Sequence, residues 1–184
     1  MYEVEPTAIP GCLVLRPIVR QDARGAFVKI FHRPFFAGLG FDLDFAEIYV
    51  SRSRKGVVRG LHFQAPPADH DKLVCCLDGR ILDAVLDLRR GSPTEGHHLL
   101  FPLNGDQSAI VVVPRGCAHG FLAESEGAQV AYAVTSAYDP ERDLGVRWDG
   151  AGIPWPIDDP VVSERDAGFP ALAEFDSPFV WPTP

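Results

Sequence analysis

Residues 59–64 carry the first group of side chains that could do chemistry, Arg-Gly-Leu-His-Phe-Gln. In a β-strand alternate side chains point to opposite faces, so a strand here would place His62 on one face with Gly60 and Gln64. Arg59 would then lie on the other face. A glycine within a strand often marks the close approach of a ligand, and an imidazole beside it can move protons near neutral pH. His62 is therefore a candidate general base; the alternative is a core histidine with satisfied hydrogen bonds.

Lys72 and His119 are two further candidates. Lys72 stands directly before the apolar run 73–77, where its ammonium could be held over a cavity, although a surface position is the commoner arrangement for lysine. Residues 114–119, Pro-Arg-Gly-Cys-Ala-His, predict a tight turn that delivers His119 into a strand. This turn resembles the second signature motif of cupins, a turn that supplies a metal ligand in many of those barrels.

The companion motif of a cupin metal site, two histidines separated by one residue, is missing. Residues 61–63 contain one histidine, and the neighbours His97 and His98 would face opposite ways in a strand. We therefore predict no metal site. No Walker loop, GxGxxG, GxSxG or HExxH motif occurs in the sequence, which removes the enzyme classes that depend on them.

The elements that must position these residues are short β-rich runs separated by glycine, proline, asparagine and aspartate turn signals. This pattern, with hardly a helical stretch between the runs, is typical of an all-β sandwich or barrel. A short helical turn is expected at residues 33–38 and in the tail. The predicted strands are residues 13–17, 26–31, 46–51, 57–64, 73–77, 81–88, 97–103, 109–113, 118–123 and 129–136.

From Asp139 onward the composition shifts to proline, aspartate and tryptophan, which favours neither a long helix nor a central strand. Because this tail contains Trp148, Trp155, Phe175 and Trp181, it is too apolar for a free linker, and we expect it to wrap over the core. With 184 residues and no internal repeat, residues 1–184 are predicted to form a single domain.

The formal net charge of −8 argues against nucleic acid or an anionic membrane as a partner, and an anionic ligand would need a locally basic pocket. No basic and apolar leader opens the chain and no apolar run approaches the length of about 20 residues that spans a bilayer, so we expect a cytoplasmic protein. The four cysteines make no CxxC pair and are predicted to be reduced and buried.

Several segments together resemble the dTDP-4-dehydrorhamnose 3,5-epimerase family. The segments that carry the resemblance lie in family order and extend from Arg24 to Asp166, almost the whole chain. They are Arg24-Gly25, residues 56–64 (Gly-Val-Val-Arg-Gly-Leu-His-Phe-Gln), Lys72-Leu-Val, residues 79–89, residues 113–122 around His119, Tyr132, Asp139-Pro140, Trp148-Asp149, Trp155-Pro156 and residues 163–166.

The resemblance implies a cupin-type jelly-roll barrel with a short irregular tail, no metal and no cofactor. It implies a homodimer in which N-terminal strands cross to the partner. The substrate would be a nucleotide-diphosphate sugar, a 4-keto-6-deoxyhexose that is epimerised at C3 and C5 by proton abstraction and return beside the C4 ketone.

The resemblance also assigns roles to residues. His62 would be the general base, Asp166 its orienting carboxylate, and Tyr132 the acid on the opposite face. Lys72 would face the C4 oxygen, where a fixed ammonium stabilises enolate charge. The remaining assignments are Arg24 and Arg59 for the diphosphate, His119 and Asp83 as a supporting pair, and Phe27, Lys29, Glu47, Tyr49, Gln64 and Tyr138 as further substrate contacts.

The chain departs from the family pattern on the nucleotide side of the pocket. Lys29 stands where many members carry a glutamate, and Glu47 and Tyr49 stand where they carry glutamine and asparagine. Lysine cannot accept a hydrogen bond from thymine, so a base such as cytosine is one hypothesis. The other is that Lys29 and Glu47 lie on neighbouring strands and pair with each other.

Three other interpretations stay open at this stage. A single-centre epimerase would invert C3 or C5 alone, with the same chemistry. A metal-dependent cupin oxygenase would need a fuller set of ligands, and a non-catalytic sugar-binding barrel would not need base, acid and cation together.

Overall fold

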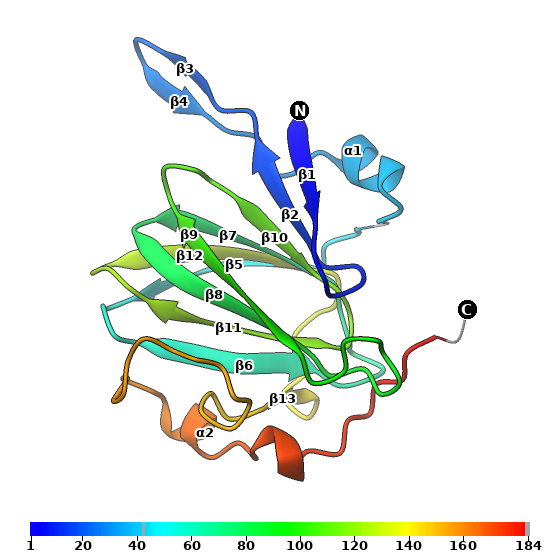
Figure 1. Cartoon of the computed structure of the whole chain (residues 1–184). Coiled ribbons are helices and arrows are strands. Elements are labelled where there is room, and N and C mark those ends of the chain that lie inside the picture. Colours follow the sequence, from blue (N-terminus) through cyan, green and yellow to red (C-terminus); the bar gives the residue numbers. More distant parts are fainter. Residues whose placement is uncertain (42, 183–184) are drawn as a thin grey trace.

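The computed structural model describes residues 1–41 and 43–182, and these form two antiparallel sheets that face each other and a separate hairpin (Figure 1). One sheet has the strand order β1-β2-β10-β7-β12-β5 and the other the order β13-β6-β11-β8-β9. The strands are β1 (Tyr2–Pro6), β2 (Leu13–Pro17), β3 (Arg20–Asp22), β4 (Gly25–Phe27), β5 (Glu47–Ser53), β6 (Val58–Gln64), β7 (Lys72–Asp78), β8 (Arg80–Asp87), β9 (His98–Asn104), β10 (Ile110–Val113), β11 (Cys117–Ala123), β12 (Ala128–Val134) and β13 (Asp143–Gly145). The helical segments are α1 (Arg33–Gly38), α2 (Glu164–Ala167) and the 3-10 turn η1 (Leu172–Glu174).

Much of both faces of the two sheets is buried, whereas the edge strand β5 is largely exposed. The space between the sheets is filled by side chains such as Val74 and Phe121, and the outer face of the six-stranded sheet packs on α1 through Phe36. The outer face of the five-stranded sheet is covered by the C-terminal segment. Because a strand buried on both faces has no polar side to show, β7 and β10 read as continuous apolar runs. Neighbouring Cys75 and Cys76 accordingly belong to different clusters, one on each side of the sheet.

The predicted all-β, cupin-type barrel is confirmed, and most strand bounds agree with the expected runs to within two residues. The short strands β1, β3 and β13 were not predicted. Each is an edge or hairpin strand of three to five residues, and β3 is exposed throughout. Such strands carry no buried stripe that a sequence pattern could reveal.

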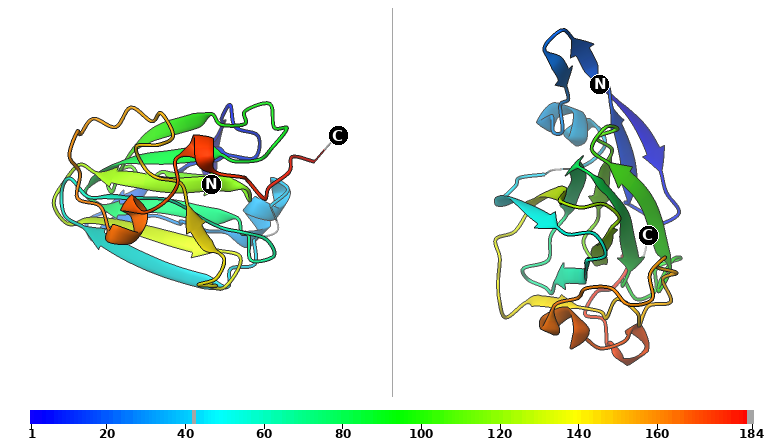
Figure 2. Two further views of the ribbon diagram at one scale, coloured as in Figure 1. Left: turned by 90° about the horizontal axis from the view of Figure 1, so that it is seen from below. Right: turned by 90° about the vertical axis from the view of Figure 1, so that its left-hand side faces the viewer.

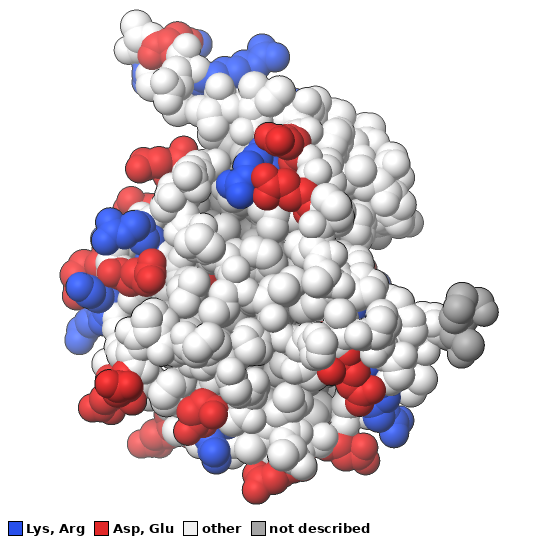
Figure 3. Space-filling model, viewed as in Figure 1, with Lys and Arg blue, Asp and Glu red and all other residues white. Residues whose placement is uncertain are grey.

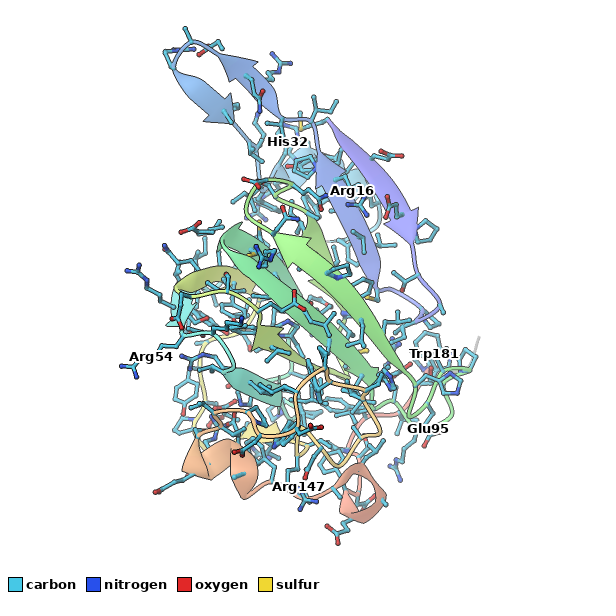
Figure 4. The ribbon with its side chains drawn as sticks, turned by 60° about the vertical axis from the view of Figure 1, so that its left-hand side comes forward. Arg16, His32, Arg54, Glu95, Arg147 and Trp181 are labelled. Atoms are coloured by element: carbon cyan, nitrogen blue, oxygen red, sulfur yellow. The ribbon has the colours of Figure 1, made fainter. Side chains whose placement is uncertain are left out.

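The hairpin of β3 and β4 projects away from the barrel and pairs with neither sheet (Figures 1 and 2). The predicted strand over residues 26–31 was therefore wrong in its second half: β4 ends at Phe27, and Phe31 packs beside Phe36 in the cluster under α1. Figure 4 labels His32, which lies where the chain returns from the hairpin to the barrel.

The tail wraps over the core, as predicted from its aromatic content. Trp155 and Phe179 are buried against the five-stranded sheet, and the ring of Trp181 stacks over the guanidinium of Arg89 at 4.3 Å. Figure 2 shows the segment crossing that face of the barrel, and Figure 4 labels Trp181 at its end. The helix α2 within this segment is capped at its N-terminus by Ser163, whose hydroxyl accepts a hydrogen bond from the Asp166 amide.

Charged side chains are interspersed on the surface. On the face seen in Figure 3, acidic and basic groups lie around the edge and on the hairpin, and the basic groups do not gather into one broad patch. All four cysteines are buried and free. No helix among the described residues is long and apolar enough to cross a membrane.

Candidate active site

A cavity of about 370 Å³ opens at one end of the barrel, between the two sheets. Nine of the side chains that the sequence analysis singled out line this cavity. The fold thus brings together residues that lie between positions 47 and 138 of the sequence. They are Glu47, Tyr49, Arg59, His62, Gln64, Lys72, His119, Tyr132 and Tyr138. Two more, Asp83 and Asp166, stand behind the lining and bind it through hydrogen bonds.

His62 is fixed by a carboxylate from the C-terminal segment. Its Nε2 lies 2.8 Å from Oδ1 of Asp166, and the other oxygen, Oδ2, accepts the backbone N–H of Gly60 at 3.0 Å. Burial alone would raise the pKa of Asp166, but the hydrogen bonds from His62, Gly60 and Ser163 outweigh it and lower that pKa. An ionised carboxylate takes the proton-bearing nitrogen of the imidazole, so Nε2 is the donor and Nδ1 is left with its lone pair.

The strand that carries His62 contains a bulge, which corrects one prediction. Strict alternation placed Arg59 on the face opposite His62, but both side chains line the cavity. The pairing of β6 with β11 shifts register between His119 and Phe121, so β6 has one residue more than its partner there. Gly60 occupies the bulge with φ of 121°, and a Cβ on it would lie 2.6 Å from the Cα of Gly120. The extra residue returns Arg59 to the inner face.

Lys72 faces the cavity from the opposite sheet. Its side chain is buried, with 6% of the residue exposed, and burial lowers its pKa to about 8 even though Asp143 and Asp83 act in the other direction. No ion pair of Lys72 occurs among the described residues. An ammonium that is buried and unneutralised is suited to stabilise a negative oxygen that forms in the cavity.

His119 and Asp83 form a buried pair on β11 and β8. His119 Nε2 lies 2.7 Å from Asp83 Oδ1, and both residues are almost fully buried. Burial lowers the pKa of His119, although the neighbouring carboxylate of Asp83 acts in the other direction. The lowered pKa keeps the imidazole neutral. The His119 ring packs edge-on against Tyr132, with ring centroids 5.9 Å apart, so the pair supports one wall of the cavity.

Tyr132 approaches the cavity from β12, in the sheet opposite His62. Its hydroxyl lies 3.2 Å from the hydroxyl of Ser51, and burial raises the pKa of the phenol far above its ordinary value. The ring stacks on that of Tyr49, its cross-strand neighbour, with centroids 4.8 Å apart and an interplanar angle of 21°. The phenol is thus held neutral and in one orientation.

Three predicted substrate residues lie outside this cavity. Arg24, Phe27 and Lys29 belong to the projecting hairpin and line a separate surface depression. Arg24 forms an exposed ion pair with Asp22 at 2.6 Å. Within one chain the structure therefore does not bring the hairpin to His62.

The suggestion that Lys29 and Glu47 lie on neighbouring strands was wrong. Lys29 lies beyond β4, which ends at Phe27, and belongs to no strand, whereas Glu47 begins β5, which pairs with β12. Glu47 instead accepts the backbone N–H of Tyr138 at 2.8 Å. This bond holds the backbone of Tyr138 next to Glu47, and both residues line the cavity.

Sequence reasoning did not assign several side chains that line the cavity, among them Asp143, Arg165 and His70. Arg165 and Asp143 form an ion pair at 2.7 Å between α2 and β13. Arg165 directly precedes Asp166, and this adjacency is a signal that could have identified it. Asp143 and His70 sit in polar segments that look like ordinary surface loops in the sequence.

The arrangement can exchange a proton beside a carbonyl group. It has a base held by a carboxylate, a neutral phenol on the facing sheet and a buried cation. A carbon acid beside a ketone becomes removable when a fixed positive charge stabilises the enolate oxygen, and inversion requires that the proton return from the other face. Among the described residues, no group of three or more His, Cys, Asp or Glu side chains is placed to hold a metal ion.

Known proteins resemble this chain over nearly its whole length. A family model described as dTDP-4-dehydrorhamnose 3,5-epimerase matches residues 6–174. The dTDP-4-dehydrorhamnose 3,5-epimerase of Methanothermobacter thermautotrophicus is 38% identical over 173 residues, which cover 91% of this chain and 93% of that protein.

Solved structures agree with this result. The dTDP-6-deoxy-D-glucose-3,5-epimerase of Legionella pneumophila, in complex with dTDP-4-keto-L-rhamnose, has a TM-score of 0.94 and 32% identity and covers 100% of both chains. ChmJ, a 3′-monoepimerase from Streptomyces bikiniensis in complex with dTDP-quinovose, has a TM-score of 0.87 and 32% identity and covers 92% of this chain and 87% of that one. With the match of fold, motifs and site, the chain belongs to the dTDP-4-dehydrorhamnose 3,5-epimerase family.

Proposed function

We propose that this protein is a sugar-nucleotide epimerase that inverts C3 and C5 of a dTDP-linked 4-keto-6-deoxyhexose. The observation that carries the proposal is the placement of His62, bound to buried Asp166, across the cavity from Tyr132. The family and the dTDP-sugar complexes of its relatives support the substrate class.

In the proposed reaction, Nδ1 of His62 removes the proton from the carbon beside the ketone. The C–H bond pair moves into the ring and the carbonyl oxygen becomes an enolate, while the imidazolium is stabilised by Asp166. Lys72 bears its positive charge beside that oxygen. The Tyr132 hydroxyl then donates its proton to the opposite face of the carbon, which inverts the centre. Exchange with solvent returns the proton of His62 to the water and restores the phenol.

Each of these groups suits its task because of its surroundings. The buried Tyr132 does not ionise at neutral pH, since burial raises its pKa, and it is therefore available as a proton donor. Lys72 has a pKa of about 8 and is charged at neutral pH. Arg59, whose Nε donates to the Ser53 hydroxyl at 3.0 Å, stands at the same cavity and supplies charge for the diphosphate.

The hairpin residues Arg24, Phe27 and Lys29 act in this proposal at the site of a second protomer. Their distance from His62 in one chain and the projection of the hairpin from the barrel support a homodimer in which each hairpin crosses to its partner. Two inactive variants, His62→Ala and Arg24→Ala, test the arrangement. After unfolding and refolding together, mixed dimers regain one intact site and part of the activity; no recovery would place Arg24 in its own chain's site.

Thymine is the proposed base, because the family and its solved complexes carry dTDP. Cytosine is tested because Lys29 stands where many family members carry a glutamate. Calorimetric titration with dTDP and CDP decides between them: a preference for dTDP of at least about tenfold, or about 1.4 kcal/mol, supports thymine, and a preference for CDP overturns it.

A second candidate is a single-centre epimerase. It is favoured by the likeness to ChmJ and by the stack of Tyr49 on Tyr132, which restricts the positions from which the phenol can donate. Incubation with dTDP-4-keto-6-deoxyglucose in heavy water, followed by NMR, tests both candidates. Deuterium at C3 and C5 supports the 3,5-epimerase, deuterium and inversion at one centre support the second candidate, and no deuterium contradicts both.

A further inference from the structure

His70 is a buried histidine in the cavity wall that the proposed reaction does not use. It lies two residues before Lys72, and both side chains line the large cavity and a second cavity of about 10 Å³ beside it. In an extended chain, side chains two residues apart point to the same face. His70 and Lys72 are thus neighbours in the wall of the cavity.

A chain of hydrogen bonds fixes the tautomer of His70. The hydroxyl of Ser136 donates to the carbonyl oxygen of Ala68 at 2.6 Å, so its single hydrogen is used. His70 Nδ1 lies 2.9 Å from the same hydroxyl oxygen and donates to it in this arrangement, and its contact with the other nearby donor, Nε2 of Gln64, is longer at 3.4 Å. With the proton on Nδ1, Nε2 carries a lone pair.

That lone pair is buried and has no hydrogen-bond partner among the described residues. Burial, with the charges of Lys72 and Arg115, lowers the pKa of His70 to about 3, so the ring stays neutral and Nε2 stays an acceptor. An acceptor sealed from water is costly unless a donor reaches it. The donor available on the same face is the ammonium of Lys72, which has three N–H groups and a flexible stem.

We infer that His70 is a positioning residue for Lys72: its Nε2 accepts a hydrogen bond from the ammonium, directly or through one water in the small cavity that the two residues share. The inference rests on the proposed function of Lys72. A carboxylate in this place would neutralise the ammonium, whereas a neutral imidazole directs one N–H and leaves the positive charge for the enolate oxygen.

The other charged and titratable groups near Lys72 are on different elements. Asp143 on β13 and Asp83 on β8 favour its protonated form, and His119 on β11 is neutral. None of these changes when His70 is replaced, so the effect of His70 can be isolated.

The test is the titration of Lys72, followed by NMR of protein labelled with ¹³C at the lysine Cε. The chain has three lysines, Lys29, Lys55 and Lys72, so each signal can be assigned by substitution. In His70→Phe we expect the midpoint of Lys72 to move about 0.5 to 1 pH unit lower, the equivalent of one hydrogen bond to the ammonium. His70→Gln, whose amide oxygen can accept, restores it; an unchanged midpoint in His70→Phe overturns the inference.

Two controls keep the result interpretable. His98→Phe makes the same change at a histidine outside the cavity and leaves the midpoint in place. If His70→Phe does not fold, Ser136→Ala decides. This variant removes the hydroxyl that accepts the Nδ1 proton of His70, so the proton is no longer held on Nδ1. A lower Lys72 midpoint then supports the inference and an unchanged one overturns it. In addition, ¹⁵N NMR of His70 should show the proton on Nδ1, and a proton on Nε2 would overturn the inference.

Kinetics separate this inference from the proposed function. If the protein is an epimerase, His70→Phe lowers kcat about tenfold, which corresponds to about 1.4 kcal/mol, while the affinity for dTDP stays within about twofold. If the natural chain shows no proton exchange but the Lys72 midpoint moves as expected, the proposed function fails and the coupling of His70 to Lys72 stands.

Discussion

The carboxylate of Asp166, in the helix α2, binds the imidazole of His62, on strand β6, across 104 residues of sequence. The same carboxylate also accepts the backbone N–H of Gly60, at the bulge that turns Arg59 toward the cavity. One side chain from the tail thus fixes the orientation of the proposed base and the shape of the strand that carries it.

Asp166→Asn should keep the fold and lose most of the activity. The amide nitrogen can donate to Nε2, which would move the imidazole proton to Nδ1 and block the nitrogen that faces the substrate. We expect kcat to fall by about 10²–10⁴-fold with dTDP binding retained. Asp149→Asn, at an exposed pair with Arg147, is the matched control. Activity within a few-fold of the natural enzyme would show that the carboxylate does not set the tautomer.

Tyr132→Phe should separate proton removal from proton return. Without the phenol, the proton that His62 removes can return only to the face it came from, so deuterium enters the substrate while inversion falls by about 10²–10⁴-fold. NMR of the recovered sugar measures both quantities. Tyr2→Phe, the same change in a tyrosine outside the cavity, serves as control. Equal losses of exchange and inversion would mean that Tyr132 shapes the pocket and is not the acid.

The protonation of Lys72 should give the pH profile of kcat/KM an alkaline limb, that is, a fall in activity at high pH. Its charged form is the active one and burial lowers its pKa to about 8, so kcat/KM should fall as pH rises through that value and be constant with respect to Lys72 below it. A profile of kcat/KM between neutral pH and about pH 9.5 measures the limb. Lys72→Met should remove it together with most of the rate, whereas exposed Lys55→Met should leave it unchanged. A limb that survives in Lys72→Met belongs to another group.

Gly60→Ala should damage both stability and activity. A Cβ at this position would lie 2.6 Å from the Cα of Gly120 and 2.8 Å from the carbonyl oxygen of His119, in a backbone conformation with φ of 121°. We expect a loss of about 2 to 4 kcal/mol in the free energy of unfolding, measured by denaturant titration. Gly38→Ala is the control, because a Cβ there meets nothing within 4 Å. A stable and active Gly60→Ala enzyme would contradict the requirement for the bulge.

The sequence predicted most of the long strands because they carry buried apolar side chains. Residues 73–77 and 118–123 are examples, and both fall within strands that the structure contains. The glycine at position 60 has another reason than the predicted approach of a ligand, because a Cβ there would lie 2.6 Å from the Cα of Gly120 on the neighbouring strand. The face of Arg59 was predicted wrongly, because a bulge adds a residue that strict alternation cannot show.

The pairing of His62 with Asp166 has no local signal, and only the family resemblance indicated it. A contact between residues so far apart in the sequence depends on how the tail packs on the barrel. The composition of the tail predicts that it covers the core, but not which of its residues contact which strand. His70 was missed for a related reason. Its significance comes from Ser136, which the fold brings to His70 and its sequence neighbour Ala68 from 66 residues away.

The most direct test of the central claim compares the natural enzyme with His62→Ala in heavy water, using dTDP-4-keto-6-deoxyglucose and NMR of the recovered sugar. The natural enzyme should incorporate deuterium at C3 and C5. His62→Ala should lose both by about 10²–10⁴-fold while it still binds dTDP, because removing the base does not disturb the phosphate contacts. Deuterium uptake by His62→Ala within a few-fold of the natural enzyme would contradict the account and assign the base to another residue.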